Sequence, residues 1–185
     1  MRRKIWRFLL CTVVLSLTNS FAQQHATFVH HNHVVLPDPA ATPGDVDHSL
    51  TKQKLCTRKI VNGKSVRVFH TGTVRNVPES LKKQVCVLYD IATGCPGQGW
   101  EIDHLVSIEL GGAEDAKNLW PQPVDAIGLI GYHTKDRVEN AANRAVCTGK
   151  ITLQDAQESI AHDWYALGLR LRVKMTELQP PPPAK

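Results

Sequence analysis

The chain has 185 residues, 42% of them hydrophobic and 21% charged, with a formal net charge of +5. This size suits one folded domain with flexible ends. The charge by itself does not indicate a nucleic-acid partner, because four Lys and Arg and no acids lie in residues 1–22. The remaining chain has 18 Lys and Arg against 17 Asp and Glu, a formal charge of +1.

Residues 1–22 form a predicted secretory signal peptide. A basic start precedes an uncharged apolar stretch from Phe8 to Leu17, and Ser20-Phe21-Ala22 fits the small-x-small cleavage pattern. The apolar stretch is shorter than the ~20 residues that span a bilayer. We therefore expect cleavage after Ala22 and a periplasmic or secreted protein without a membrane anchor; an uncleaved anchor is the alternative.

Three regions follow the signal peptide. Residues 23–50 are rich in His, Pro, Asp and Thr without an apolar period, which predicts a disordered leader. Residues 51–178 are the predicted domain. Residues 179–185 are a proline-rich tail that we expect to be extended and solvated.

Within the domain, the apolar pattern alternates between strands and helices. Val66 and Val68 indicate short strands near its start. The elements predicted after them are a helix over 78–89, a strand over 100–104, a loop over 105–116, a strand over 118–120, a helix over 133–146 and a helix from Thr152. We expect Gly111-Gly112 to turn the loop and Pro121 to end the second strand.

Four cysteines remain after cleavage of the signal: Cys56, Cys86, Cys95 and Cys147. An even number in an exported chain predicts two disulfides. Three pairings are open; we favour Cys86–Cys95, which closes a short loop, together with Cys56–Cys147, which ties the two ends of the domain. A zinc site is the alternative, but no Cys-x-x-Cys spacing supports it.

Charge is distributed unevenly along the domain. Residues 52–83 contain nine basic residues and one acid, whereas residues 84–116 contain six acids and no Lys or Arg. A basic arm beside an acidic pocket suits attraction of phosphates around a cation site. Ordinary solvated surface is the alternative interpretation.

The segment 101–121 has the most informative motif: Glu-Ile-Asp-His-Leu, then Glu-Leu-Gly-Gly, then Asn-Leu-Trp-Pro. A strand ending in Asp-His, a loop, a strand that begins with Asn and a helix resembles, in this order, the HNH endonuclease family. The resemblance covers about residues 55–165. It implies an α+β fold with a ββα-metal core, meaning two short antiparallel strands, a long loop and a helix, with additional packing helices.

The chemistry of the motif suits phosphodiester hydrolysis. His104 can accept a proton from water near neutral pH. Asp103 is a hard anionic ligand for Mg²⁺ or Mn²⁺, with Zn²⁺ or Ni²⁺ as alternatives. The resemblance further implies that Asn118 braces the loop and orients the His104 ring.

The helix after the second strand is expected to complete the site. At 100° per residue, His133, Asp136, Arg137, Asn140 and Arg144 share one face. The family carries its second metal ligand here, which implies His133 in that role, with Asp136 as the alternative ligand. Candidates for phosphate contact are Lys135, Arg137 and Arg144.

Departures from the family concern the helix more than the strand. Ser107 replaces a common proline, Asn118 and His133 are further apart than usual, and the paired zinc-binding cysteines are absent.

We expect an exported, monomeric, metal-dependent endonuclease that cuts DNA with little sequence specificity. RNA is an open alternative substrate. A non-catalytic periplasmic nucleic-acid- or metal-binding protein of the same fold is the second hypothesis. A toxin with a partner inhibitor protein is the third.

Overall fold

The computed structural model describes residues 25–31, 33–69, 76–91, 93, 95–126 and 128–175. These residues form a mixed helix and strand fold, which confirms the α+β class, with three two-stranded antiparallel sheets. The predicted signal peptide and proline-rich tail lie outside the described residues. Among the described residues, no helix is long and apolar enough to cross a membrane.

The strands are β1 (Val29–His31), β2 (Val34–Leu36), β3 (Arg58–Val61), β4 (Lys64–Arg67), β5 (Trp100–His104) and β6 (Leu119–Pro123). The helices are α1 (Lys52–Cys56), α3 (Glu79–Leu88), α4 (Tyr132–Cys147) and α5 (Leu153–Arg170). Two short 3-10 turns, η1 (Ile108–Leu110) and η2 (Ala116–Asn118), lie in the loop between β5 and β6.

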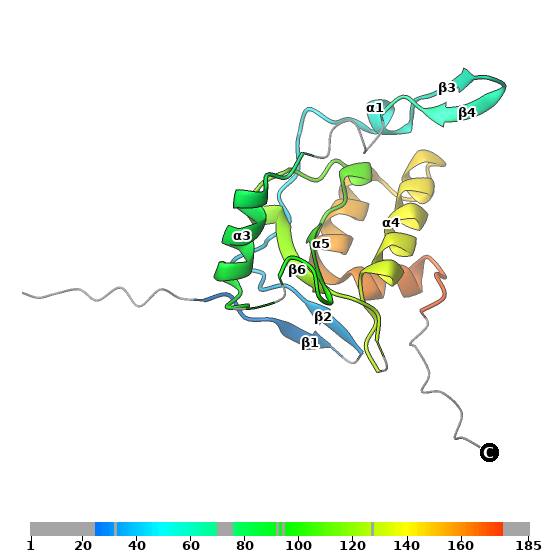
Figure 1. The fold of residues 1–185 in the computed structure, drawn as a ribbon. Helices are drawn as coiled ribbons and strands as arrows, with labels where there is room; N and C mark the ends of the chain where they lie inside the picture. Colours follow the sequence, from blue (N-terminus) through cyan, green and yellow to red (C-terminus); the bar gives the residue numbers. More distant parts are fainter. Residues whose placement is uncertain are drawn as a thin grey trace, which may run out of the picture.

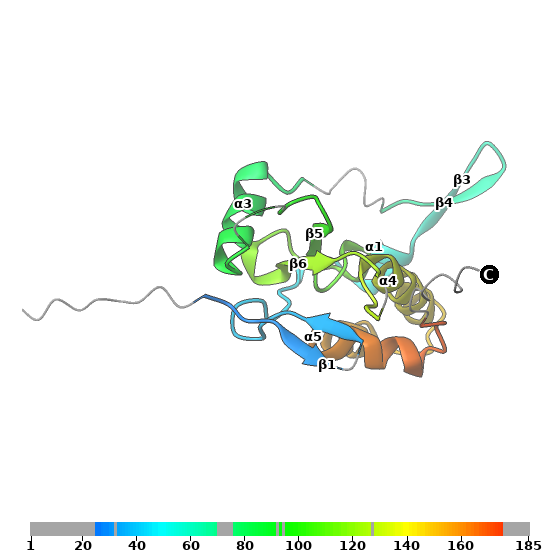
Figure 2. The same ribbon diagram turned by 60° about the horizontal axis from the view of Figure 1, so that its bottom comes forward.

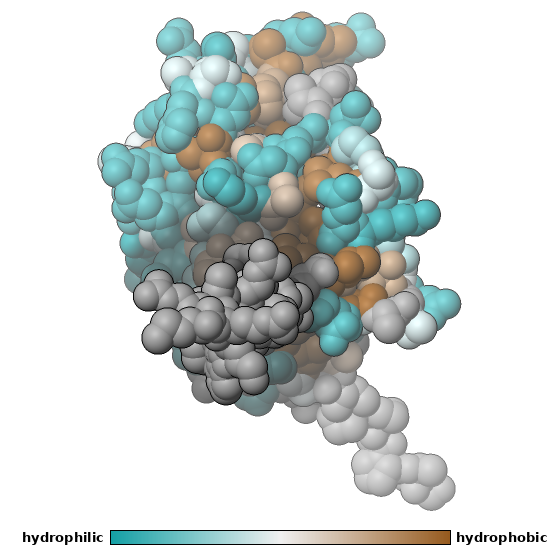
Figure 3. Space-filling model, turned by 90° about the vertical axis from the view of Figure 1, so that its left-hand side faces the viewer, coloured by the Kyte–Doolittle hydropathy of each residue, from teal (hydrophilic) through white to brown (hydrophobic). Residues whose placement is uncertain are grey.

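The sheet of β5 and β6 lies between α3 on one side and α4 with α5 on the other (Figure 1). After rotation, β1, β2 and α5 form a lower layer beneath α3, β6 and α4 (Figure 2). The β3–β4 hairpin extends away from this body in both views. The face that carries α3 is mostly hydrophilic, with small separate apolar areas (Figure 3).

The leader departs from the prediction of disorder, which is wrong for its described part. β2 is buried along its whole length, and it lies between two hydrophobic clusters. Val34 and Leu36 belong to the cluster with α4 and α5, whereas Val35 belongs to the cluster with α3, β5 and β6. Because successive side chains of a strand face opposite sides, a three-residue apolar run can join two cores.

The two long helices match their predicted positions. Thr152 caps α5, since its hydroxyl accepts a hydrogen bond from the backbone N–H of Asp155 at 2.9 Å. One stripe of α5, at Ala156, Ile160, Trp164 and Leu167, is buried. α5 contains a kink at Asp163, where the backbone leaves helical geometry.

The second strand of the motif is longer than predicted. β6 continues through Pro121 to Pro123, and it pairs with β5 in a register that sets Ile102 opposite Pro121 and His104 opposite Leu119. In a two-stranded sheet every strand is an edge, so a proline without an N–H is tolerated where that position faces away from the partner.

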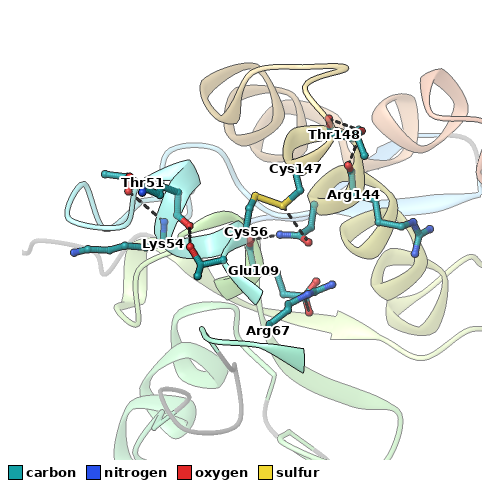
Figure 4. Close-up of a disulfide and its surroundings, with 12 residues drawn as sticks. Thr51, Lys54, Cys56, Arg67, Glu109, Arg144, Cys147 and Thr148 are labelled. Atoms are coloured by element: carbon teal, nitrogen blue, oxygen red, sulfur yellow. Dashed lines mark hydrogen bonds and ion pairs between the residues drawn. A yellow bond between two sulfur atoms is a disulfide. The ribbon is translucent and has the colours of Figure 1, made fainter. Parts of the chain in front are cut away.

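Both disulfides form with the favoured pairing, which confirms it. Cys86–Cys95 joins the end of α3 to the loop before β5, and Cys56–Cys147 joins α1 to the end of α4. Figure 4 shows the second bond with Arg67 and Glu109 beside it. Disulfides persist in oxidising compartments, so this pairing is compatible with a secreted protein.

Candidate functional site

The Asp-His pair lies at the end of β5. Strand pairing with β6 fixes both residues, with Asp103 opposite Trp120 and His104 opposite Leu119. Asp103 is 8% exposed and His104 is 2% exposed. The imidazole is therefore almost entirely enclosed in the free protein.

Asn118 braces the loop that follows the pair. Its side-chain oxygen accepts from the N–H of Val106 at 2.8 Å, and its amide nitrogen donates to the carbonyls of Val106 and Ala113, both at 2.9 Å. A side chain on Gly112 would come within 1.8 Å of the Val106 carbonyl oxygen, so the turn requires glycine there. The loop-bracing role is as predicted, and these bonds go to loop backbone.

The Lys135 side chain is completely buried, and it joins α4 to the end of β5. Its ammonium donates to Asp103 Oδ2 at 2.8 Å and to the carbonyl oxygen of His104 at 2.6 Å. It also pairs with the carboxylate of Glu139, one helical turn along α4. Sequence reasoning predicted Lys135 as a phosphate contact, but this enclosed position differs from that expectation, because all three ammonium donors have partners within the protein.

Carboxylates outnumber this single cation. Burial would lower the pKa of Lys135, but Asp103 and Glu139 outweigh it and raise that pKa, so the ammonium stays charged. Burial raises the pKa of Glu139, and so do the charges of Asp103 and Asp136. The pKa of Asp136 is also raised, by partial burial and by the nearby charges of Asp103 and Glu101. The end of β5 and the start of α4 therefore form an electronegative region.

His133 lies on the exposed side of the first turn of α4, with a side chain that is 62% exposed. Its Nδ1 contacts Asp125 Oδ2 at 3.2 Å. The same carboxylate accepts from the N–H groups of Gly131 and His133 at 3.0 Å and from the Thr134 hydroxyl at 2.7 Å. Burial opposes ionisation of Asp125, but these bonds outweigh it and lower its pKa. Asp125 thus holds both the helix start and the His133 ring in place.

A cleft of about 530 Å³ opens beside the electronegative region. Its lining includes Lys82 of α3, Trp100 and Glu101 of β5, and Tyr132 at the start of α4. The Tyr132 ring lies 4.3 Å from the His133 ring, measured between centroids. A cleft of this volume is in the size range of small-ligand sites.

The remaining predicted residues lie farther along α4. Arg137 Nη2 donates to the Thr134 hydroxyl at 2.8 Å, which keeps it near the first turn. Arg144 follows His133 by eleven residues, about 16 Å along a helix, and lines a different cleft. Among the residues that the structure describes, no three His, Cys, Asp or Glu side chains converge as a ready metal cage.

Sequence reasoning missed the roles of Glu139 and Asp125. The Lys135–Glu139 spacing of four places both side chains on one helix face, a signal that could have indicated their pairing. Asp125 had no such signal, because the loop that brings it to α4 has no periodic pattern.

The chain matches no protein-family model, and comparisons with curated proteins and with solved structures gave no significant match.

Proposed function

We propose that this protein is an exported, metal-dependent endonuclease of the HNH type, which hydrolyses phosphodiester bonds of DNA. The observation that carries the proposal is the contact of Lys135 with both Asp103 and the His104 carbonyl. This contact brings the Asp-His pair against the helix that the resemblance assigns to the site. The electronegative region and the adjacent cleft support it further.

His104 would act as the general base that takes a proton from the attacking water. Lys135 would hold the strand end through the His104 carbonyl, and Asn118 would hold the loop that follows. A general base must come within hydrogen-bond reach of the water, directly or through one water. Because the ring is 2% exposed, we expect the substrate to enter through the cleft beside Glu101 and Tyr132.

The donor set fits Mg²⁺ or Mn²⁺. These ions are commonly held by one or two carboxylates together with waters and substrate phosphates, so a three-residue cage is not required. Asp103 would be one ligand, and His133 or Asp136 the other. The contact of His133 Nδ1 with Asp125 supports the first choice, because metal-bound histidines usually have a carboxylate on their other ring nitrogen. When bound, the ion would neutralise charge on the phosphate and the leaving oxygen.

Two observations favour the alternative, a non-catalytic nucleic-acid- or metal-binding protein of the same fold. The His104 ring is enclosed, and the Lys135 ammonium occupies one oxygen of Asp103. Under this alternative the protein would bind DNA or metal ions and leave phosphodiester bonds intact.

Plasmid nicking tests the proposal. We expect the mature protein to nick supercoiled DNA with Mg²⁺ or Mn²⁺, chelator to stop the reaction, and His104→Ala to lower the rate at least ~100-fold. The matched control is His162→Ala, an exposed histidine outside the site. Thermal unfolding of both variants checks that they fold. Wild-type activity in His104→Ala would remove the assigned base, and DNA binding without nicking by the wild type would favour the alternative.

Calorimetric titration with Mn²⁺ separates the two ligand assignments. If His133 is the second ligand, His133→Ala weakens Mn²⁺ binding by ~10-fold or more, whereas Asp136→Asn leaves it nearly unchanged. The reverse result would assign the ligand to Asp136.

A further inference from the structure

The β3–β4 hairpin is an unusual element, because most residues on both of its faces are exposed. All residues of β3 are exposed, and in β4 only Val66 and Arg67 are partly covered. Ile60 is 70% exposed and Val61 is 41% exposed. Two-stranded ribbons are marginal in water by themselves, so a ribbon with two largely exposed faces and an aliphatic end indicates a surface that receives a partner.

The hairpin is nevertheless firmly attached at its base. Cys56, just before β3, is bonded to Cys147 of α4. Arg67, at the end of β4, pairs with the Glu109 carboxylate, and Asn143 of α4 donates to the Glu109 carbonyl at 2.8 Å. Figure 4 shows the disulfide together with Arg67 and Glu109. The tip turns at Asn62 and Gly63, both with positive φ (50° and 73°), which suits a tight two-residue hairpin turn.

The charge of the hairpin is of one sign. Residues 52–69 contain six Lys and Arg and no Asp or Glu. The strand register sets Arg58 opposite Arg67 and Val61 opposite Lys64. Since neighbouring residues face opposite sides, Arg58 and Arg67 lie on one face, and Lys59 and Lys64 lie on the other. Arg67 is paired with Glu109, so the first face presents Arg58, whereas the second presents Lys59 and Lys64. Each face also carries an aliphatic side chain, Ile60 or Val61.

We infer that this hairpin is a DNA-binding ribbon that enters the major groove of duplex DNA. The inference rests on the proposed function and names how its substrate is held. The major groove of B-form DNA, about 12 Å wide, admits a two-stranded ribbon. Cations on both faces would meet phosphates on both walls, while Ile60 and Val61 would contact base edges and sugars. The major groove of duplex RNA is too narrow and deep for side chains to read, so the ribbon selects DNA.

The location agrees with this assignment. The hairpin and α3, which carries Lys82 and Lys83, lie on opposite sides of β5, β6 and α4 (Figure 2). Glu109, which holds Arg67, belongs to the loop that follows the Asp-His pair. A duplex seated on the ribbon would thus be attached through the same loop that Asn118 braces.

Fluorescence anisotropy with a labelled 20-base-pair duplex in chelator, over a range of KCl concentrations, tests the inference. We expect Lys59→Ala/Lys64→Ala to weaken binding ~10-fold or more and to reduce the slope of log affinity against log salt by about 1.8, since each phosphate contact contributes about 0.9. The matched control is Lys117→Ala/Lys174→Ala, which removes the same charge from exposed lysines outside the hairpin. Ile60→Ser should weaken binding while the salt slope stays constant.

Three results would overturn the inference: unchanged affinity in the hairpin variant, an equal loss in the control pair, or an equal loss on duplex RNA.

Hydrolysis of bis(4-nitrophenyl) phosphate, a substrate too small to reach the hairpin, separates a failure of this inference from a failure of the proposed function. If the hairpin variant keeps this activity but nicks plasmid more slowly, both stand. If the wild type hydrolyses neither substrate, the proposed function fails, and the anisotropy result alone decides the role of the hairpin.

Discussion

At the scale of single residues, Lys135 is a fully buried cation at the candidate site. An ammonium without exposed surface is stable only if its desolvation is offset by close anions and hydrogen bonds. Asp103, Glu139 and the His104 carbonyl supply them. The contacts with Asp103 and the His104 carbonyl fix the end of β5 against α4, so the orientation of the candidate site depends on one buried cation.

Replacing Lys135 by Met removes this cation and keeps most of the side-chain volume. We expect the free energy of unfolding to fall by ~3–5 kcal/mol, because two enclosed carboxylates lose their shared partner. Urea denaturation at pH 7 measures the change. Lys150→Met, at an exposed position, is the control and should change the stability by less than ~0.5 kcal/mol.

The double variant Lys135→Met/Glu139→Gln adds a second readout. It should recover part of the loss, because burial without Lys135 forces Glu139 to take up a proton, whereas the amide of the second substitution needs none. A loss below ~1 kcal/mol in Lys135→Met, or no recovery in the double variant, would contradict the assigned role.

At the scale of elements, disulfide bonds and polar contacts hold short secondary-structure elements in place where packing is insufficient. α1 has five residues and only Leu55 of them is buried. The Cys56–Cys147 bond connects it to α4, although the two cysteines are 91 residues apart in sequence. Cys86–Cys95 spans 9 residues and restrains the entry to β5.

The two disulfides should therefore differ in their contribution to stability. In the chain-entropy description, closing the longer loop stabilises by about 4–5 kcal/mol and closing the shorter one by about 2–3 kcal/mol. We expect Cys56→Ser/Cys147→Ser to lower the free energy of unfolding by about 2 kcal/mol more than Cys86→Ser/Cys95→Ser. Guanidinium denaturation of the two variants checks the order, and the reverse order would show that local strain or packing outweighs loop length.

At the scale of the whole molecule, the leader joins the two hydrophobic clusters and supports the candidate site. Beyond β2, Gly44 donates to the Lys117 carbonyl at 2.9 Å, and Asp47 donates to the Gly111 carbonyl at 2.8 Å. The Tyr89 hydroxyl lies 2.7 Å from the Thr42 hydroxyl and accepts from the Asp38 N–H at 3.2 Å. These bonds tie residues 38–47 to α3 and to the loop between β5 and β6.

Ionisation of Tyr89 makes its contacts with Thr42 and Asp38 sensitive to alkaline pH. Burial raises the pKa of its phenol from 10.0 to about 12. Between these values the unfolded chain releases the proton and the folded protein keeps it. The stability is therefore fully present below pH 10 and is lost as the pH rises through 12, by up to ~2.7 kcal/mol at 1.36 kcal/mol per pKa unit.

We expect the free energy of unfolding of the wild type to fall by this ~2.7 kcal/mol between pH 9.5 and 12, relative to Tyr89→Phe, which cannot titrate at this position. Urea denaturation of both proteins at each pH measures the difference. Parallel pH profiles for the two proteins would contradict the burial of an un-ionised phenol.

Local patterns in the sequence predicted much of the fold. The apolar period of α3, α4 and α5, the start of a helix at Thr152 and the strand ending in Asp103-His104 depend on neighbouring residues, and they lie where the patterns indicate. A short strand was predicted at Val66, which lies in β4, but its pairing with β3 in a hairpin was missed, although Asn62-Gly63 is a strong hairpin signal. The leader was missed because a three-residue strand shows no period, and its burial depends on partners far along the chain.

The sequence by itself determined the α+β class and the positions of its main helices and β5, and it supplied the candidate site residues. Only the tertiary structure decided that Lys135 is enclosed between Asp103 and Glu139, that Asp125 holds His133, and that β2 joins the two cores. The physical reason is the distance along the chain over which each effect acts. Helical period and capping act over a few neighbouring residues, whereas burial of a charge depends on what the folded chain brings around it.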